Sequence, residues 1–365
     1  MATSPPSDTR STGWLHALGW LIIASAVACR GGCSAPLKPQ GATPELIRRV
    51  SSPADEGAVR VDIDDASPAF LVAGSSGPIR IWTETASGAD RDTSLPDAGP
   101  VLEARFSAAG VFVVPEQGPI TLWNWHDKSA VHTYRFAHHG RRAAVSADGR
   151  FVAVGGAVLE VATDRELGQA QQLVTQSSLA FSANGKRVVS AGFHEPRIVV
   201  RDLPSGSVRQ WLASDKISNA ALSPSAEIVA ASVKSGRIHF WRLPSGDELG
   251  SWQSHADVRG ICFRPAGSAI IALDPEGFSV VDIASTQQTW RANLEGELWA
   301  FACDGELVAA GTTQGELWLW DVARQVLRAR LRLSTSAVAA LDISATRQRI
   351  AAADEKGQAG IWSWK

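Results

Sequence analysis

The residues most able to do chemistry are sparse and scattered along this sequence. Of its eight histidines, only His138 and His139 are adjacent, and they open a basic segment that also contains Arg141 and Arg142. Two neighbouring imidazoles without a third ligand make a poor metal site. The zinc, phosphate, calcium and nucleophile motifs of common active sites are absent from the sequence. We therefore predict no catalytic residue, no metal and no cofactor. A solvated loop is the favoured interpretation of residues 138–142, and a cationic surface for an acidic partner is the alternative.

The four cysteines form no CxxC pair. Cys262 and Cys303 each stand alone in an apolar run, which favours buried thiols that behave as small hydrophobic side chains. A disulfide between these two residues, or a reactive thiol, is the alternative. Three acids, Asp148, Asp274 and Asp304, lie in predicted turns, where we interpret them as turn formers and not as a site.

An apolar run precedes the first cysteine. Residues 14–28 are mostly apolar, end in small residues and stop directly before Cys29. That run is too short to span a bilayer and is typical of a secretory signal. Residues 26–29 (AVAC) resemble the lipobox of bacterial lipoproteins, which implies a diacylated Cys29 as the new N-terminus. We expect a signal peptide over 1–28 and a flexible tether over 29–43. Cleavage without a lipid and an uncleaved anchor are the alternatives.

The rest of the chain, residues 44–365, carries a repeat of about 40 residues. An alternating apolar run ends in tryptophan at Trp82, Trp123, Trp241, Trp320 and Trp362, and weaker copies surround positions 159, 201 and 281. Gly-containing turns precede the second and third predicted strands of most copies, and such turns indicate hairpins. Each copy therefore predicts four short antiparallel strands, as in a propeller blade.

These copies resemble WD repeats. Trp320-Asp321 is a strict Trp-Asp pair, and His255 stands where that family places the histidine of its Gly-His pair. The resemblance implies an all-β, eight-bladed β-propeller of four-stranded antiparallel blades. Seven blades with an irregular segment is the alternative, because the third copy is the most degenerate. The segment 45–50 precedes the first copy, and the last copy lacks a fourth strand. We expect these two parts to pair and close the ring.

The recurring tryptophans are interpreted as structural residues that pack between blades, with Asp321 beside them. Three further tryptophans, Trp211, Trp252 and Trp290, fall on predicted outer strands. We expect them to cover the rim, and an exposed interaction patch is the alternative.

The charge balance limits the classes of partner. Lys plus Arg total 35 and Asp plus Glu total 37, so the basic surplus typical of nucleic-acid binders is missing. By analogy with other propellers, we predict a non-catalytic scaffold that binds one or more unidentified proteins. Its candidate contacts are His138, His139, Arg141, Arg142 and His255. No small-molecule substrate is expected.

The expected location is the bacterial cell envelope, with a lipid or signal anchor in the membrane and the propeller facing the periplasm or the exterior. One alternative is an envelope-assembly component similar to the propeller lipoprotein of the barrel-assembly machinery. Another is an enzyme or small-ligand binder with a site in the central channel.

Overall fold

The computed structural model describes residues 44–51, 58–75, 77–83, 91–135, 140–167, 176–192, 194, 196–203 and 205–364. All of these residues lie in the unit Lys38–Lys365. The predicted signal peptide, Cys29, Cys33 and the predicted tether lie outside the described residues, and so do His138 and His139.

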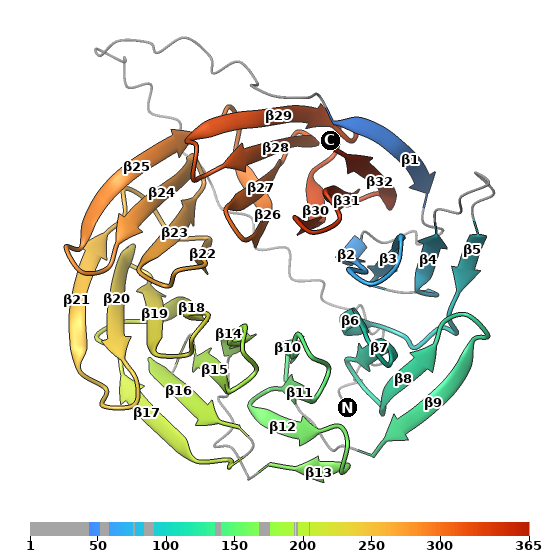
Figure 1. Ribbon diagram of the computed structural model, residues 1–365, viewed down its shortest axis with the longest axis horizontal. Helices are drawn as coiled ribbons and strands as arrows, with labels where there is room; N and C mark the ends of the chain where they lie inside the picture. Colours follow the sequence, from blue (N-terminus) through green and yellow to red (C-terminus); the bar gives the residue numbers. More distant parts are fainter. Residues whose placement is uncertain are drawn as a thin grey trace, which may run out of the picture. The chain divides into compact units, whose positions relative to one another are not determined.

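The described chain folds into eight four-stranded antiparallel sheets. Figure 1 shows these sheets as blades around a central channel, with the first strand of each blade innermost. The predicted eight-bladed β-propeller is therefore confirmed, and the seven-bladed alternative is wrong. Blade three is short, but it still forms a complete sheet of four strands in the order β10-β11-β12-β13.

The strands follow one another from the channel to the rim in every blade. Blades one to four consist of β2 (Ala58–Ile63), β3 (Ala69–Gly74), β4 (Arg80–Thr83) and β5 (Arg91–Ser94); β6 (Val101–Ser107), β7 (Gly110–Pro115), β8 (Ile120–Asn124) and β9 (Ser129–Tyr134); β10 (Ala143–Val145), β11 (Phe151–Val154), β12 (Ala157–Glu160) and β13 (Arg165–Glu166); and β14 (Gln176–Phe181), β15 (Arg187–Gly192), β16 (Arg197–Asp202) and β17 (Val208–Leu212). Blades five to eight consist of β18 (Ile217–Leu222), β19 (Ile228–Val233), β20 (Arg237–Arg242) and β21 (Glu248–Gln253); β22 (Gly260–Phe263), β23 (Ala269–Asp274), β24 (Gly277–Asp282) and β25 (Gln287–Asn293); β26 (Leu298–Asp304), β27 (Leu307–Thr312), β28 (Glu316–Asp321) and β29 (Val326–Arg332); and β30 (Val338–Ser344), β31 (Arg349–Asp354), β32 (Gln358–Ser363) and β1 (Glu45–Ser51).

Tight turns with glycine at positive φ connect these short strands. Gly277 opens β24 with φ 153°, and a Cβ atom there would lie 2.1 Å from the Ala292 carbonyl oxygen of the next strand. Gly110 opens β7 in the same way, with φ 138° and the Trp123 carbonyl oxygen 2.2 Å from a Cβ atom. A side chain cannot occupy either position without moving backbone, so these glycines set the blade geometry.

The ring closes through strands from opposite ends of the sequence. β1 pairs antiparallel with β32, with Leu46 opposite Trp362 and Val50 opposite Ala359. β1 is therefore the outermost strand of blade eight, next to the last strand of the chain (Figure 1). This pairing confirms the predicted closure and removes two free strand edges.

The hydrophobic core lies between neighbouring blades. Trp320 of β28 is 0 % exposed and packs with Ile271 and Phe278 of blade six. Trp362 likewise packs with Leu317 and Leu319 of blade seven. The recurring tryptophans Trp82, Trp123, Trp241, Trp320 and Trp362 all lie on third strands: β4, β8, β20, β28 and β32. Large aromatic rings at one repeated position therefore fill the spaces between sheets.

The three outer-strand tryptophans are partly buried, not fully exposed. Trp211, Trp252 and Trp290 lie on β17, β21 and β25 and pack against the cores of their blades. Trp290 stacks edge-on against Trp320, with ring centroids 6.0 Å apart. The most exposed apolar side chain on these three strands is Leu212, which is 77 % exposed.

Candidate functional site

Eight equivalent residues on the inner strands define the wall of the channel. In each blade, one inner-strand residue pairs with the third residue of the second strand, and we call it the channel position. In order from blade one, the channel positions are Asp62, Arg105, Ala144, Ala180, Ala221, Cys262, Ala302 and Asp342. The charged residues fall in blades eight, one and two, which form the charged arc. The small residues of blades three to seven form the small arc.

Carboxylates of the charged arc hold neighbouring blades together. Asp62 Oδ2 accepts a 2.7 Å hydrogen bond from the Phe106 N–H of blade two. Asp342 Oδ2 accepts the corresponding 2.8 Å bond from the Ile63 N–H of blade one. In both bonds, the carboxylate at the channel position of one blade accepts an N–H group from the following blade. The donor is the residue directly after the channel position of that following blade. The same side-chain placement therefore repeats at two consecutive blade junctions.

Arginines neutralise part of this negative charge. Arg105 Nε lies 3.8 Å from Asp62 Oδ1, and Arg60 Nε lies 3.3 Å from Glu103 Oε2. Glu103 is on β6, two residues before Arg105. The arc thus interleaves acids and bases from three blades, which orders their long side chains around the channel.

Burial controls the protonation of the arc. Burial raises the pKa of Asp62 well above its usual value, and the nearby Asp342 carboxylate raises it further. Burial also raises the pKa of Asp342 to about 6. The pKa of Glu103 is raised by burial too, although Arg60 and Arg105 oppose that shift. The charged form of a carboxyl group is poorly solvated there, so the arc holds protons more tightly than surface carboxylates do.

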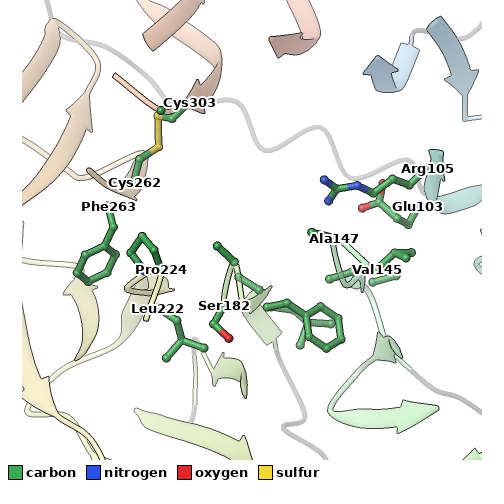
Figure 2. A pocket seen from close by; sticks show the side chains of 17 residues that line it. Glu103, Arg105, Val145, Ala147, Ser182, Leu222, Pro224, Cys262, Phe263 and Cys303 are labelled. Carbon is green, nitrogen blue, oxygen red and sulfur yellow. A yellow bond between two sulfur atoms is a disulfide. The ribbon is translucent and has the colours of Figure 1, made fainter. Parts of the chain in front are cut away.

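A cavity of about 520 Å³ extends from the charged arc across to the small arc. Figure 2 shows Glu103 and Arg105 on one side of it and Leu222, Phe263 and the Cys262–Cys303 bond on the other. Small side chains such as Ala144 and Ala180 leave this space open. The cavity therefore offers an ionic end and an apolar wall, which suits an amphipathic group.

Cys262 and Cys303 form a disulfide across the junction of blades six and seven. The sequence-based prediction of two separate buried thiols is therefore wrong. Cys262 is the channel position of β22, and Cys303 follows the channel position of β26. Asp62 and Phe106 occupy the same two positions in blades one and two. The disulfide therefore joins blades six and seven at the place where a hydrogen bond joins blades one and two.

An exposed tryptophan lies where the inner strands begin, at the end of the channel that we call the linker mouth. Trp299 is the second residue of β26, and the pairing register with β27 shifts between Leu298 and Ala300. Leu298 and Ala300 are 1 % and 9 % exposed, whereas Trp299 is 50 % exposed. The bulge therefore turns a large aromatic side chain out of the blade.

Of the predicted partner-binding residues, the structure describes Arg141, Arg142 and His255, and it places them at different blade junctions. Arg141 and Arg142 are exposed and directly precede β10 of blade three, whereas His255 is exposed in the linker between blades five and six. His255 is thus separate from Arg141 and Arg142.

The acids interpreted as turn formers have different roles. Asp148 accepts hydrogen bonds from Ser146 Oγ and the Arg150 N–H within its turn. Asp304 Oδ2 instead accepts a 2.6 Å bond from the Ala345 N–H of blade eight. Asp274 is 1 % exposed and lies 2.6 Å from Arg291 Nη1.

The strict Trp-Asp pair also has an internal structural role. Asp321 is buried and accepts bonds from the Arg324 N–H at 3.0 Å and from Arg328 Nη2 at 2.7 Å. These bonds tie β28 to β29 within blade seven.

Sequence reasoning missed the charged arc and Trp299. Asp62, Arg105 and Asp342 lie in different copies and belong to no short motif. The repeat itself contained the signal for the disulfide, because the 41-residue separation of Cys262 and Cys303 is one repeat length.

The described residues contain neither a membrane helix nor a metal site. The described chain contains no helix long and apolar enough to cross a bilayer. Within the same residues, no group of three or more histidine, cysteine, aspartate or glutamate side chains is arranged to hold a metal ion.

The fold and its channel define the class of the protein as an eight-bladed β-propeller, and comparisons with known proteins relate it to WD-repeat propellers. No family model matches the chain. Pre-mRNA-processing factor 19 homolog 2 from Arabidopsis thaliana is 24 % identical over 186 residues, which are 48 % of this chain and 35 % of that protein. Small ribosomal subunit protein RACK1 from Brassica napus is 22 % identical over 130 residues, which are 30 % of this chain and 40 % of that protein.

Both relatives are WD-repeat propeller proteins and distant homologues of this chain. The matches span only 35 % and 40 % of the relatives' own lengths. A solved structure, that of the computationally designed Ika8 protein, superposes with a TM-score of 0.70 at 17 % identity. That superposition covers 85 % of this chain and 97 % of the designed chain, and it supports the fold alone.

Proposed function

We propose that this chain is a non-catalytic protein-interaction scaffold whose partner docks on the linker mouth of the propeller. The exposed Trp299 is the observation that carries this proposal. Tryptophan is enriched among the residues that dominate binding energy at protein interfaces. The homology to WD-repeat propeller proteins is consistent with a scaffold, but it does not specify the docking face.

The surroundings of Trp299 support its role as a docking residue. Arg259 Nη2 pairs with Glu297 Oε1 at 3.1 Å, and Arg330 Nη1 pairs with Glu295 Oε2 at 2.8 Å. Glu295 and Glu297 lie four and two residues before Trp299 in the sequence. An apolar centre beside polar and charged groups is the usual anatomy of an interface, because the polar groups exclude water from the centre once the partner is bound.

The test is quantitative affinity capture with full-length wild type, Trp299→Ala and Leu212→Ala. Leu212 is a matched control because it is apolar and 77 % exposed but lies on the outer strand of blade four. We expect Trp299→Ala to lose a defined partner at least about tenfold and Leu212→Ala to keep it. Equal capture by all three proteins would contradict docking at the linker mouth.

The location in the cell envelope is part of the same proposal. The Cys262–Cys303 disulfide supports it, because disulfides form and persist in oxidising compartments outside the cytosol. We propose that residues 1–28 direct export and that Cys29 is lipidated, with residues 29–43 as the tether to the propeller. The mature masses and membrane fractionation of wild type and Cys29→Ala test this, because a diacyl-sized mass difference must depend on Cys29. The identity of the captured partner distinguishes a general scaffold from an envelope-assembly component.

The channel cavity favours a second candidate function, the binding of a small ligand. Its 520 Å³ volume and its pairing of Glu103 and Arg105 with an apolar wall suit a ligand with a charged group and an apolar body. Arg105→Met keeps most of the side-chain volume and removes the charge. A ligand that stabilises wild type but not Arg105→Met in a thermal-shift screen would support this function.

A further inference from the structure

A second hollow, of about 360 Å³, lies where the ring closes. Its lining comes from three segments: β1, the end of β29 with the linker that follows it, and the turn between β31 and β32. These segments supply Arg49, Arg332 and Lys356, respectively. We call this hollow the closure pocket. It is outside the channel and shares no lining residue with the 520 Å³ cavity.

The closure pocket gathers positive charge without matching negative charge. The described residues that line it include three cations, serine and threonine hydroxyls and Gln358, but no carboxylate. The carboxylate that pairs with a cation of the lining is Glu316, whose Oε1 lies 3.6 Å from Arg332 Nη1. Glu316 Oε2 is already 2.9 Å from Arg330 Nη2. Glu316 thus pairs with both Arg330 and Arg332, and its single negative charge neutralises little of the positive charge in the closure pocket.

Backbone carbonyl groups hold the two guanidinium groups in place, and a side chain fixes the turn that carries Lys356. Arg49 Nη2 donates a 3.0 Å hydrogen bond to the Arg332 carbonyl oxygen, which fixes one guanidinium beside the start of the other side chain. Arg332 Nε donates a 3.1 Å bond to the Ser334 carbonyl oxygen. The turn that carries Lys356 is anchored by Asp354 Oδ1, which accepts the Lys356 and Gln358 N–H groups at 2.9 and 2.8 Å. Like charges kept together by such bonds repel one another, and a bound anion would relieve that repulsion.

We propose that the closure pocket binds a phosphoryl group. Guanidinium groups match the geometry of phosphate oxygens and form strong charge-assisted hydrogen bonds with them, and a lysine adds a compact positive charge. The volume exceeds that of a single phosphate ion, so the pocket also accepts a phosphate ester. The bound group would bridge β1 and blades seven and eight. Because it would bind only the closed ring, it would stabilise the folded state.

The test uses the full chain and inorganic phosphate as the probe, with chloride at equal ionic strength as the reference. We expect saturable binding by calorimetry and a phosphate-dependent rise in the melting temperature of wild type. Arg49→Gln and Lys356→Gln should each weaken phosphate binding about tenfold. Arg165→Gln is the matched control, because Arg165 is an exposed arginine of blade three, far from the pocket lining. It should bind phosphate as wild type does.

Two results would overturn the proposal: no saturable phosphate binding by wild type, or an equal loss in Arg165→Gln. If Arg49→Gln destabilises β1, Lys356→Gln still gives the answer, because Asp354 and not the Lys356 side chain holds its turn. Sedimentation with vesicles separates the possible sources of the phosphoryl group. Stronger binding to phosphatidylglycerol than to phosphatidylcholine vesicles, lost in Lys356→Gln, identifies a lipid headgroup. Phosphate binding without vesicle preference identifies a soluble phosphate compound.

Discussion

The charged arc and the small arc use the same position of the same repeat for different purposes. In blades one and eight, this position is Asp62 or Asp342, and each carboxylate accepts an N–H group of the next blade. In blades three, four, five and seven it is alanine, which leaves the channel open. The propeller scaffold therefore tolerates wide variation along its channel. The residue at that position can therefore hold neighbouring blades together in the charged arc and leave room for a ligand in the small arc.

The largest effect on this comparison should come from removing the disulfide of the small arc. In the chain-entropy model, a crosslink that closes a loop of 41 residues contributes about 4 kcal/mol. We expect Cys262→Ala/Cys303→Ala to lower the melting temperature clearly, by destabilising the junction of blades six and seven. Differential scanning calorimetry measures this shift. Reductant should lower the melting temperature of wild type similarly and leave the double variant unchanged; a wild type insensitive to both changes would contradict the prediction.

An intermediate effect should come from neutralising the charged arc. Burial raises the pKa of Asp342 to about 6, above its unfolded value of about 4. The folded state therefore binds this proton more tightly, and the stability gained from it is lost as the pH rises from about 4 to 6. Asp342→Asn keeps an oxygen acceptor for the Ile63 N–H but cannot ionise. We expect the variant to be about 2 kcal/mol more stable than wild type at pH 8 and nearly equal at pH 4.

Denaturant unfolding at several pH values measures the Asp342 difference. Asp148→Asn is a suitable control, because Asp148 is an exposed acid in a turn of blade three. A stability difference between Asp342→Asn and wild type that is the same at pH 4 and pH 8 would show that Asp342 is not the titrating group.

The smallest effect is expected from filling the small arc. Ala180 lines the 520 Å³ cavity, so two extra methyl groups at this position enter open space. Ala180→Val should change the free energy of unfolding by no more than about 0.5 kcal/mol. Ala230→Val is the contrasting variant, because Ala230 is 0 % exposed in blade five and added volume there costs about 1–3 kcal/mol. Equal destabilisation by both substitutions would mean that the cavity wall is closely packed.

The sequence was sufficient for the architecture because the architecture is repeated. Each copy restates the same strands and glycine turns, so a weak copy such as blade three is identified by its neighbours. The charged arc, unlike the strands and turns, is not repeated from copy to copy. Asp342 joins Asp62 and Arg105 only because the ring brings the last blade beside the first, and no local pattern records that contact.

Trp299 and the disulfide show two further limits of sequence reasoning. The exposure of Trp299 depends on a one-residue register shift within an apolar strand. Simple alternation of side chains along a strand does not include such a shift, so it does not predict which face Trp299 occupies. Each cysteine alone stands in an apolar run and indicates a buried thiol. Placed on the repeat, their 41-residue separation indicates adjacent blades.

The pairing of β1 with β32 has a consequence for the kinetics of folding. Among the described strands, β1 comes first in the sequence and its partner β32 comes last. Pairings so distant in sequence form slowly, because a very long loop must close before any contact rewards it. Until that step, β32 offers an open edge to the β1 strand of any other copy. We expect closure within one chain to compete with strand exchange between two chains, so the yield of monomer should fall as the protein concentration during refolding rises.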